Sequence, residues 1–258
     1  MFQTSVLASG SKGNCILVRS QETGIIIDAG ISLKRIWTAL DDLKIPRSII
    51  KAVIISHEHY DHTRSAGALA RSLKIPLMIT ADTYDYCSHR LGKVHDWLHY
   101  FEIGREFMIG DILIHPFRSS HDAADSCNFR LEHDHRSLGI VMDLGYYTKL
   151  TVSTLQSINT LILESNHDIQ MLMDGPYEPN LKQRIKSEHG HLSNEQAVGL
   201  LTQVIHPGLK NLVLAHLSEI NNHPELAHKV MNDYLQSIRS DICLIMADQY
   251  NHTRLVDI

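Results

Sequence analysis

The densest group of metal-ligand side chains in the chain is one run of six residues, His57-Glu58-His59-Tyr60-Asp61-His62. Imidazole and carboxylate ligands without a thiolate suit zinc, manganese or iron. In an extended or turn conformation, alternate side chains face the same way. We therefore expect His57 and His59 to bind one metal ion and Asp61 and His62 to face a neighbouring ion. The competing interpretation is a histidine-rich surface loop in a chain that has 18 histidines.

Ligand-type residues follow six short apolar runs along the chain. In α/β folds, ligands gather at the carboxyl ends of the strands. A buried polar group with its own hydrogen-bond partner explains one such case, but six cases favour convergence on one site, and they argue against a surface loop. The six strand-end residues are Asp28, His57, His121, Asp143, Glu164 and His216.

The elements that must position these residues alternate between apolar strands and amphipathic helices. Strands are predicted at 5–7, 15–18, 24–27, 52–55, 77–79, 160–163, 211–214 and 242–246. Helices are predicted at 32–43, 66–73, 178–186, 193–205 and 224–238. The middle of the chain, 96–143, is richer in strands and suggests hairpins. This mixture predicts an α/β architecture of mixed sheets covered by helices.

Bulk composition describes an ordinary globular protein. The chain has 258 residues, 43% of them hydrophobic, a net charge of −5 and no long apolar segment. It lacks the strongly basic balance of proteins that hold nucleic acid by bulk charge. Four scattered cysteines without a CxxC pair predict free thiols, and the N-terminus resembles no signal peptide. We therefore expect a single domain over 1–258, no membrane association and a cytoplasmic location.

The pattern His57-x-His59-x-Asp61-His62 after a buried strand resembles the signature of the metallo-β-lactamase superfamily. The resemblance covers the whole chain and implies an αββα sandwich, a four-layer fold of two mixed sheets flanked by helices. It also implies two divalent ions (Zn, Mn or Fe) per chain. The implied first site is His57, His59, His121 and Asp143, and the implied second site is Asp61, His62, Asp143 and His216.

Other positions take their roles from the same resemblance. Asp28, in an Asp-x-Gly motif, is implied to orient the ligand histidines without binding metal. An aspartate rather than a cysteine at Asp143 is typical of the phosphodiesterase and nuclease branches. The stretch between Asp143 and His216 is too short for the β-CASP insertion of larger nucleases.

The expected chemistry is phosphodiester hydrolysis by a metal-bridged hydroxide, because paired cations lower the pKa of a shared water. Asp61 is expected to help orient the nucleophile. The leaving oxygen still needs a proton donor, and His191, in a Gly-His-Leu-Ser element, is the candidate. Ser193 predicts a helix N-cap that would aim His191. Glu164 is expected to hydrogen-bond either His191 or a metal-ligating histidine and to set the tautomer of that ring. The alternative is that His191 only packs or caps locally.

The runs at 7–14, 120–123, 164–168, 190–194 and 216–222 resemble those of the YycJ/WalJ-like subgroup, which implies a DNA exonuclease acting 5′ to 3′ on duplex DNA. In the loop before the second strand, Ser11, Lys12 and Asn14 are candidates for holding a phosphate, although the loop can equally be an ordinary tight turn. The basic stretch 182–186 can contact a nucleic-acid backbone or be a solvated face.

Two other functions remain open. One is a small-molecule hydrolase on the same dinuclear core, acting on a cyclic phosphodiester, thioester or lactone. The other is a non-catalytic metal-binding regulatory protein. The oligomeric state is open in each case.

Overall fold

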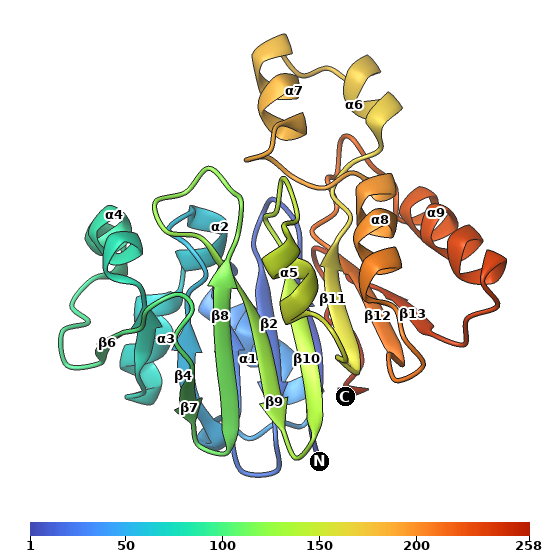
Figure 1. Cartoon of the computed structure of the whole chain (residues 1–258). Coiled ribbons are helices and arrows are strands. Elements are labelled where there is room, and N and C mark those ends of the chain that lie inside the picture. Colours follow the sequence, from blue (N-terminus) through green and yellow to red (C-terminus); the bar gives the residue numbers. More distant parts are fainter.

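The computed structural model describes residues 1–258, which form two mixed seven-stranded sheets (Figure 1). The first sheet has the order β14 (Val256–Asp257), β1 (Gln3–Ala8), β2 (Cys15–Arg19), β3 (Gly24–Ile27), β4 (Ile50–Ile54), β5 (Leu77–Ile79) and β6 (Leu98–Tyr100). The second has the order β13 (Cys243–Met246), β12 (Asn211–Ala215), β11 (Thr160–Glu164), β10 (Arg136–Val141), β9 (Cys127–His133), β8 (Ile112–Arg118) and β7 (Phe107–Ile109). Each sheet combines parallel and antiparallel pairs, as expected from the sequence.

Side chains that alternate along the strands build three apolar layers. Ile25 and Ile27 of β3 pack between the two sheets, whereas Ile26 packs against helices on the outer face. The same division holds in the second sheet, where Ile162 faces the inner layer and Leu161 the outer one. Strand β3 has no polar side chain, because both of its faces are covered and both sets of its side chains leave water.

Helices cover the outer face of each sheet and complete the four-layer αββα arrangement. The first sheet is covered by α1 (Leu33–Asp42), α3 (Ala66–Leu73) and α4 (Ala81–Leu91). The second is covered by α5 (Lys149–Thr154), α8 (Asn194–Val204) and α9 (Pro224–Ser237). The remaining helical segments are η1 (Arg47–Ile49), α2 (Tyr60–Thr63), α6 (Ile169–Asp174) and α7 (Pro179–Lys186). No helix has both the length and the apolar character needed to cross a membrane.

The expected fold class is confirmed, and the predicted helices lie within one or two residues of their observed bounds. Ser193 caps α8 in a capping box with Gln196, as its spacing predicts. Three helices, α4, α5 and α6, lie outside the predicted ranges. Helix α4 buries only Thr83, Cys87 and Leu91 and so has no clear apolar stripe, while α5 and α6 are too short to show a period. Of the two conformations expected for the ligand run, extended or turn, Tyr60–Thr63 adopts one helical turn. Asp61 and His62 therefore project from a helix, while His57 and His59 precede it.

The strands that carry the six strand-end residues run in the same direction in their sheets, so all six residues reach one edge of the sandwich. Three of them adopt left-handed backbone conformations, with φ of 57° at Asp28, 51° at Asp143 and 55° at His216. This conformation costs a non-glycine residue roughly 1–2 kcal/mol and turns its side chain away from the strand direction. The surrounding fold stabilises this unfavourable backbone geometry where the ligand-type side chains meet.

Candidate metal centre and active site

The two ligand groups that the sequence predicts come together at the strand ends. His57, His59 and His121 form one group and Asp61, His62 and His216 another, and within each group the ligand atoms lie within 4.8 Å of one another. His59 Nδ1 is 3.0 Å from His57 Nε2 and 3.4 Å from His121 Nε2. His62 Nε2 is 3.4 Å from Asp61 Oδ2. The first group combines segments that are far apart in the sequence.

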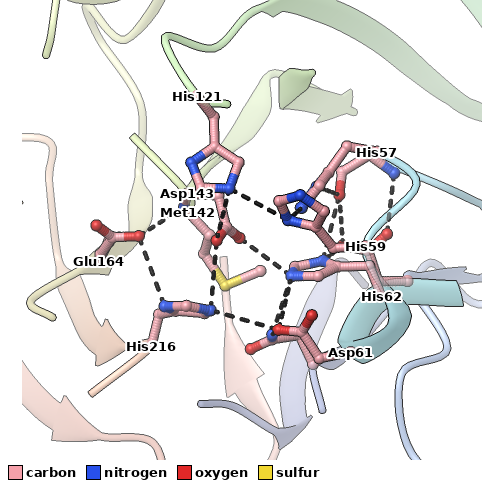
Figure 2. A network of polar contacts seen from close by, with 12 residues as sticks. His57, His59, Asp61, His62, His121, Met142, Asp143, Glu164 and His216 are labelled. Carbon is pink, nitrogen blue, oxygen red and sulfur yellow. Dashed lines mark hydrogen bonds and ion pairs between the residues drawn. The ribbon is translucent and has the colours of Figure 1, made fainter. Parts of the chain in front are cut away.

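Asp143 lies between the two groups (Figure 2). Its Oδ1 is 3.7 Å from His121 Nε2 and 3.5 Å from His216 Nε2, and its Oδ2 is 3.2 Å from His62 Nε2. One carboxylate thus faces both groups. This is the position that a bridging ligand requires.

The donor set fits divalent cations. Asp143 Oδ2 and His216 Nε2 are buried and make no hydrogen bond, although ligand-type atoms surround them. Buried polar atoms without partners are costly in a folded protein, and coordination to a cation is one way to satisfy them. Nitrogen and carboxylate ligands without thiolate suit zinc, manganese or iron. The residues present therefore fit divalent metal ions.

Electrostatics favour positive charge at this centre. Burial raises the pKa of Asp143, but His216 and His62 outweigh it and hold that pKa well below its ordinary value. Burial lowers the pKa of His57, so this ring is neutral, as a metal-binding imidazole must be. Burial also lowers the pKa of His62, but nearby carboxylates, Asp143 first among them, raise it overall.

Asp28 lies behind the ligand histidines, fully buried. Its Oδ2 is 2.7 Å from His62 Nδ1 and accepts a hydrogen bond from Ser56 Oγ, while Oδ1 accepts one from Ser56 N. A carboxylate on Nδ1 leaves Nε2 of the same ring available to a metal. The structure thus places Asp28 where the sequence expects it, in contact with a ligand and outside the cluster.

Glu164 connects His191 to the cluster. This fully buried carboxylate accepts hydrogen bonds from Asp143 N and Leu192 N, each at 2.6 Å, and its Oε2 is 3.2 Å from His191 Nδ1. Burial lowers the pKa of His191, but Glu164 raises it more, to about 9. Because Glu164 is the partner of Nδ1, the Nε2 atom of His191 remains available to a substrate in the cleft that this ring lines.

The three predicted phosphate contacts lie in different environments. Ser11 lines the cleft. Lys12 is exposed, with Nζ 2.6 Å from Glu219 Oε2 and 2.8 Å from Tyr250 Oη. Asn14 is fully buried and its Nδ2 lies 3.0 Å from His62 Nε2, so it contacts the ligand side chains from within the protein rather than from the cleft.

Sequence reasoning missed several residues that hold the site together. Asn166 Nδ2 donates to the His216 carbonyl oxygen at 2.9 Å, and Ser9 Oγ accepts from His216 N at 2.8 Å. Glu58 Oε1 accepts from Ala124 N at 2.9 Å and so fastens the loop after His121. Asn166 lies in a polar run after β11 that the sequence does single out, but no local pattern marks Ser9 or Glu58 as partners of these backbone groups.

Comparison with known proteins places the chain in a family. Residues 23–217 match the family model described as "Beta-lactamase superfamily domain". The exodeoxyribonuclease YycJ of Bacillus anthracis is 34% identical over 90% of this chain and 88% of its own length. The exodeoxyribonuclease WalJ of Streptococcus pneumoniae is 36% identical over 91% of this chain and 88% of its own length.

A solved structure supports the same assignment at the level of the fold. The metallo-β-lactamase fold protein YhfI from Bacillus subtilis superposes with a TM-score of 0.74 over 98% of both chains, at 16% identity. The chain therefore belongs to the metallo-β-lactamase superfamily, in the group that includes the exodeoxyribonucleases YycJ and WalJ.

Proposed function

We propose that this metal-dependent hydrolase removes nucleotides from an end of duplex DNA. The observation that carries the proposal is the position of Asp143, whose carboxylate faces both histidine groups beside a cleft. A carboxylate bridge, rather than a cysteine, suits the phosphodiesterase branches of the superfamily. The names of YycJ and WalJ support DNA as the substrate, and digestion from the 5′ end is the expected polarity.

The ligand atoms divide into two sets. His57, His59, His121 and Asp143 would hold one divalent ion, and Asp61, His62, Asp143 and His216 the other. When bound, such a pair supplies Lewis acidity and a strong oxygen nucleophile at neutral pH. Zinc, manganese and iron all suit these ligands.

The chain's own groups orient the reactants and move one proton. Asp61, at the edge of the cleft, orients the attacking oxygen through its carboxylate. His191 donates the proton on Nε2 to the leaving oxygen of the DNA. Glu164 contacts His191 at Nδ1. The hydrogen bonds that Glu164 accepts from Asp143 N and Leu192 N fix the position of the His191 ring relative to the metal-ligand residues.

The proposal is tested on metal-free protein to which Mn²⁺ or Zn²⁺ is returned. The substrates are 5′-phosphorylated duplex DNA labelled at either end, a cyclic nucleotide and a thioester. We expect stepwise loss of nucleotides from one DNA end, little turnover of the other two substrates, and a loss of activity in Asp61→Ala. His228→Ala, an exposed histidine on α9, is the matched control.

Each alternative function has its own outcome. Turnover of the cyclic nucleotide or thioester without DNA digestion supports a small-molecule hydrolase. Failure of every substrate with either metal overturns the proposal of DNA hydrolysis. A cytoplasmic location is part of the proposal, and the four free cysteines are compatible with it.

A further inference from the structure

One wall of the active-site cleft takes no part in metal binding or proton transfer. The cleft has a volume of about 250 Å³. One side consists of ligand-type residues, including His59, Asp61 and His216. The other side consists of Tyr177, Leu181, Arg184 and Ile185, which belong to α7 and the segment before it. Helix α7 stands above the strand ends, apart from the sandwich (Figure 1).

Helix α7 presents apolar side chains to the cleft although it contributes nothing to the core. None of its residues is buried. Leu181 and Ile185 are four residues apart and so share one face of the helix. Leu181 is 37% exposed, and Tyr177, just before the helix, is half-buried. Apolar groups that line a cleft without packing into the core leave a surface for a flat apolar group of a ligand.

This wall is attached to the loop that carries His191. His191 N donates to Ile185 O at 2.9 Å, and Arg184 pairs with Asp122 on the opposite side of the cleft. A Cβ on Gly190 would overlap the carbonyl oxygens of Arg184 and Ile185. Glycine therefore permits the close contact that sets α7 at a defined position relative to His191.

Charge on α7 favours a nucleic acid as the occupant. Lys182 and Lys186 reach back to Met173, with Lys182 Nζ 2.7 Å from the Met173 carbonyl oxygen. Together with Arg184, the one cation of the three that lines the cleft, they give the eight-residue helix three positive charges. Grooves for single-stranded nucleic acid combine positive charge with side chains on which bases stack.

Cleft size decides how much of the DNA enters. Sites for drug-sized ligands commonly occupy about 300–1,000 Å³, and this cleft is smaller. A volume of about 250 Å³ suits a single nucleotide better than a base pair. A terminal nucleotide that enters the cleft alone has left its partner before its phosphodiester reaches Asp143 and His191.

We propose that Tyr177, Leu181 and Ile185 form a platform on which the unpaired base of the terminal nucleotide stacks during hydrolysis. The platform rests on the proposed DNA exonuclease function and adds to it a requirement for an opened end. Stacking accepts every base, because every base has an apolar face. The enzyme is thus insensitive to terminal sequence except through the ease with which the end opens.

The test uses three duplexes that differ only at the digested end, which carries a matched pair, a mismatched base or an abasic residue. Mismatched and abasic ends are both unpaired, so their comparison isolates stacking. We expect kcat/KM for the abasic end to be about 5- to 150-fold lower, which corresponds to the roughly 1–3 kcal/mol of one stacked base. The mismatched end should be cut roughly 10-fold faster than the matched end, because one base-pair step costs about 1.4 kcal/mol to open.

Variants of Tyr177 and Leu181 test whether the base stacks on this wall of the cleft. Tyr177→Ala combined with Leu181→Ala should lower kcat/KM on the mismatched end and cause no further loss on the abasic end, while Tyr177→Phe retains the preference. These side chains lie outside the core, so the fold should persist. Tyr86→Ala, an exposed tyrosine on α4, is the matched control.

The outcomes separate this inference from the proposed function. If the wild-type protein digests DNA but cuts mismatched and abasic ends equally well, the platform is wrong and the exonuclease stands. If the double variant keeps the full preference for a base, the platform lies elsewhere and the inference is overturned. If no DNA is digested, the proposed function fails and the platform fails with it.

Discussion

Glu164→Gln is the most informative single substitution, because Glu164 contacts three groups of the active site and its Oε2 also lies 3.7 Å from His216 Nδ1. Its two oxygens accept from Asp143 N and Leu192 N at 2.6 Å, and Oε2 is also 3.2 Å from His191 Nδ1. Glutamine preserves the shape but has only one acceptor oxygen. Both backbone N–H groups and the His191 ring therefore lose a charged partner, and one of the two N–H groups loses its acceptor.

The expected size of the effect follows from these contacts. A hydrogen bond to a charged group contributes about 1.5–3 kcal/mol. If that stabilisation of His191 is lost in the transition state, kcat on DNA falls roughly 10- to 150-fold, at about 1.36 kcal/mol per factor of ten. Removing the ring itself, as in His191→Gln, should cost about 10²–10⁴-fold, the usual share of a general acid.

Two substrates separate proton donation from general damage. The leaving alcohol of DNA needs a proton, whereas the p-nitrophenolate of thymidine 5′-p-nitrophenyl phosphate leaves without one. We expect Glu164→Gln and His191→Gln to impair DNA hydrolysis strongly and hydrolysis of the aryl ester little. Metal content, measured in parallel, should stay at the wild-type value.

The double variant tests whether Glu164 acts through His191. If it does, adding Glu164→Gln to His191→Gln causes no further loss, because the group that Glu164 positions is already absent. Losses that multiply in the double variant, or an equal loss on both substrates with metal content unchanged, would refute the reasoning.

Three further predictions concern the metal centre and the pH dependence of stability. Asp143→Ala should abolish the rise in Tm that Zn²⁺ gives the metal-free wild-type protein. A metal site filled at a thousand times its Kd adds about 4 kcal/mol to the free energy of unfolding. A rise in Tm as large as that of the wild-type protein would contradict the bridging role of Asp143. Gly30→Ala should lower metal content and activity, because its Cβ would overlap the Asp61 carbonyl oxygen. The comparison is Gly104→Ala, where the Cβ meets no atom. Equal metal content in the two variants would contradict the expected role of Gly30. Burial lowers the pKa of His167 to about 4, whereas a histidine in the unfolded chain has a pKa near 6.5. As the pH falls from 7 to 5, the unfolded chain therefore binds a proton at this position and the folded chain does not. The wild-type protein should lose about 2 kcal/mol of unfolding free energy over this range that His167→Gln does not lose, and urea unfolding curves that shift in parallel for both proteins would exclude His167 as the cause.

Much of the fold could be read from local patterns. The capping box at Ser193, the apolar spacing in α1 and the fully apolar strands each depend on neighbours a few residues away. Such patterns are visible in the sequence because helices and strands place side chains with fixed periods. The short helices α5 and α6, at six residues each, span too few turns for a period to show.

The candidate site likewise contains residues that local patterns identify and residues that only long-range contacts identify. Its ligand-type residues were recognisable because each one follows an apolar strand, and the strand pattern is local. The role of Asn14 was not, because its side chain meets His62 across 48 positions of sequence. Lys12 is likewise defined by Glu219 and Tyr250, which lie at the other end of the chain.

The sequence by itself determined which chemical groups this protein can offer and that six of them lie at strand ends. Only the tertiary structure decided which atoms face one another: that Asp143 lies between two histidine groups, that Glu164 holds His191, and that α7 forms an apolar wall opposite them. The physical reason is that residue type and periodicity are local properties of the chain. Convergence at the ligand cluster depends instead on the packing of two sheets, which joins segments as distant as Ser9 and His216.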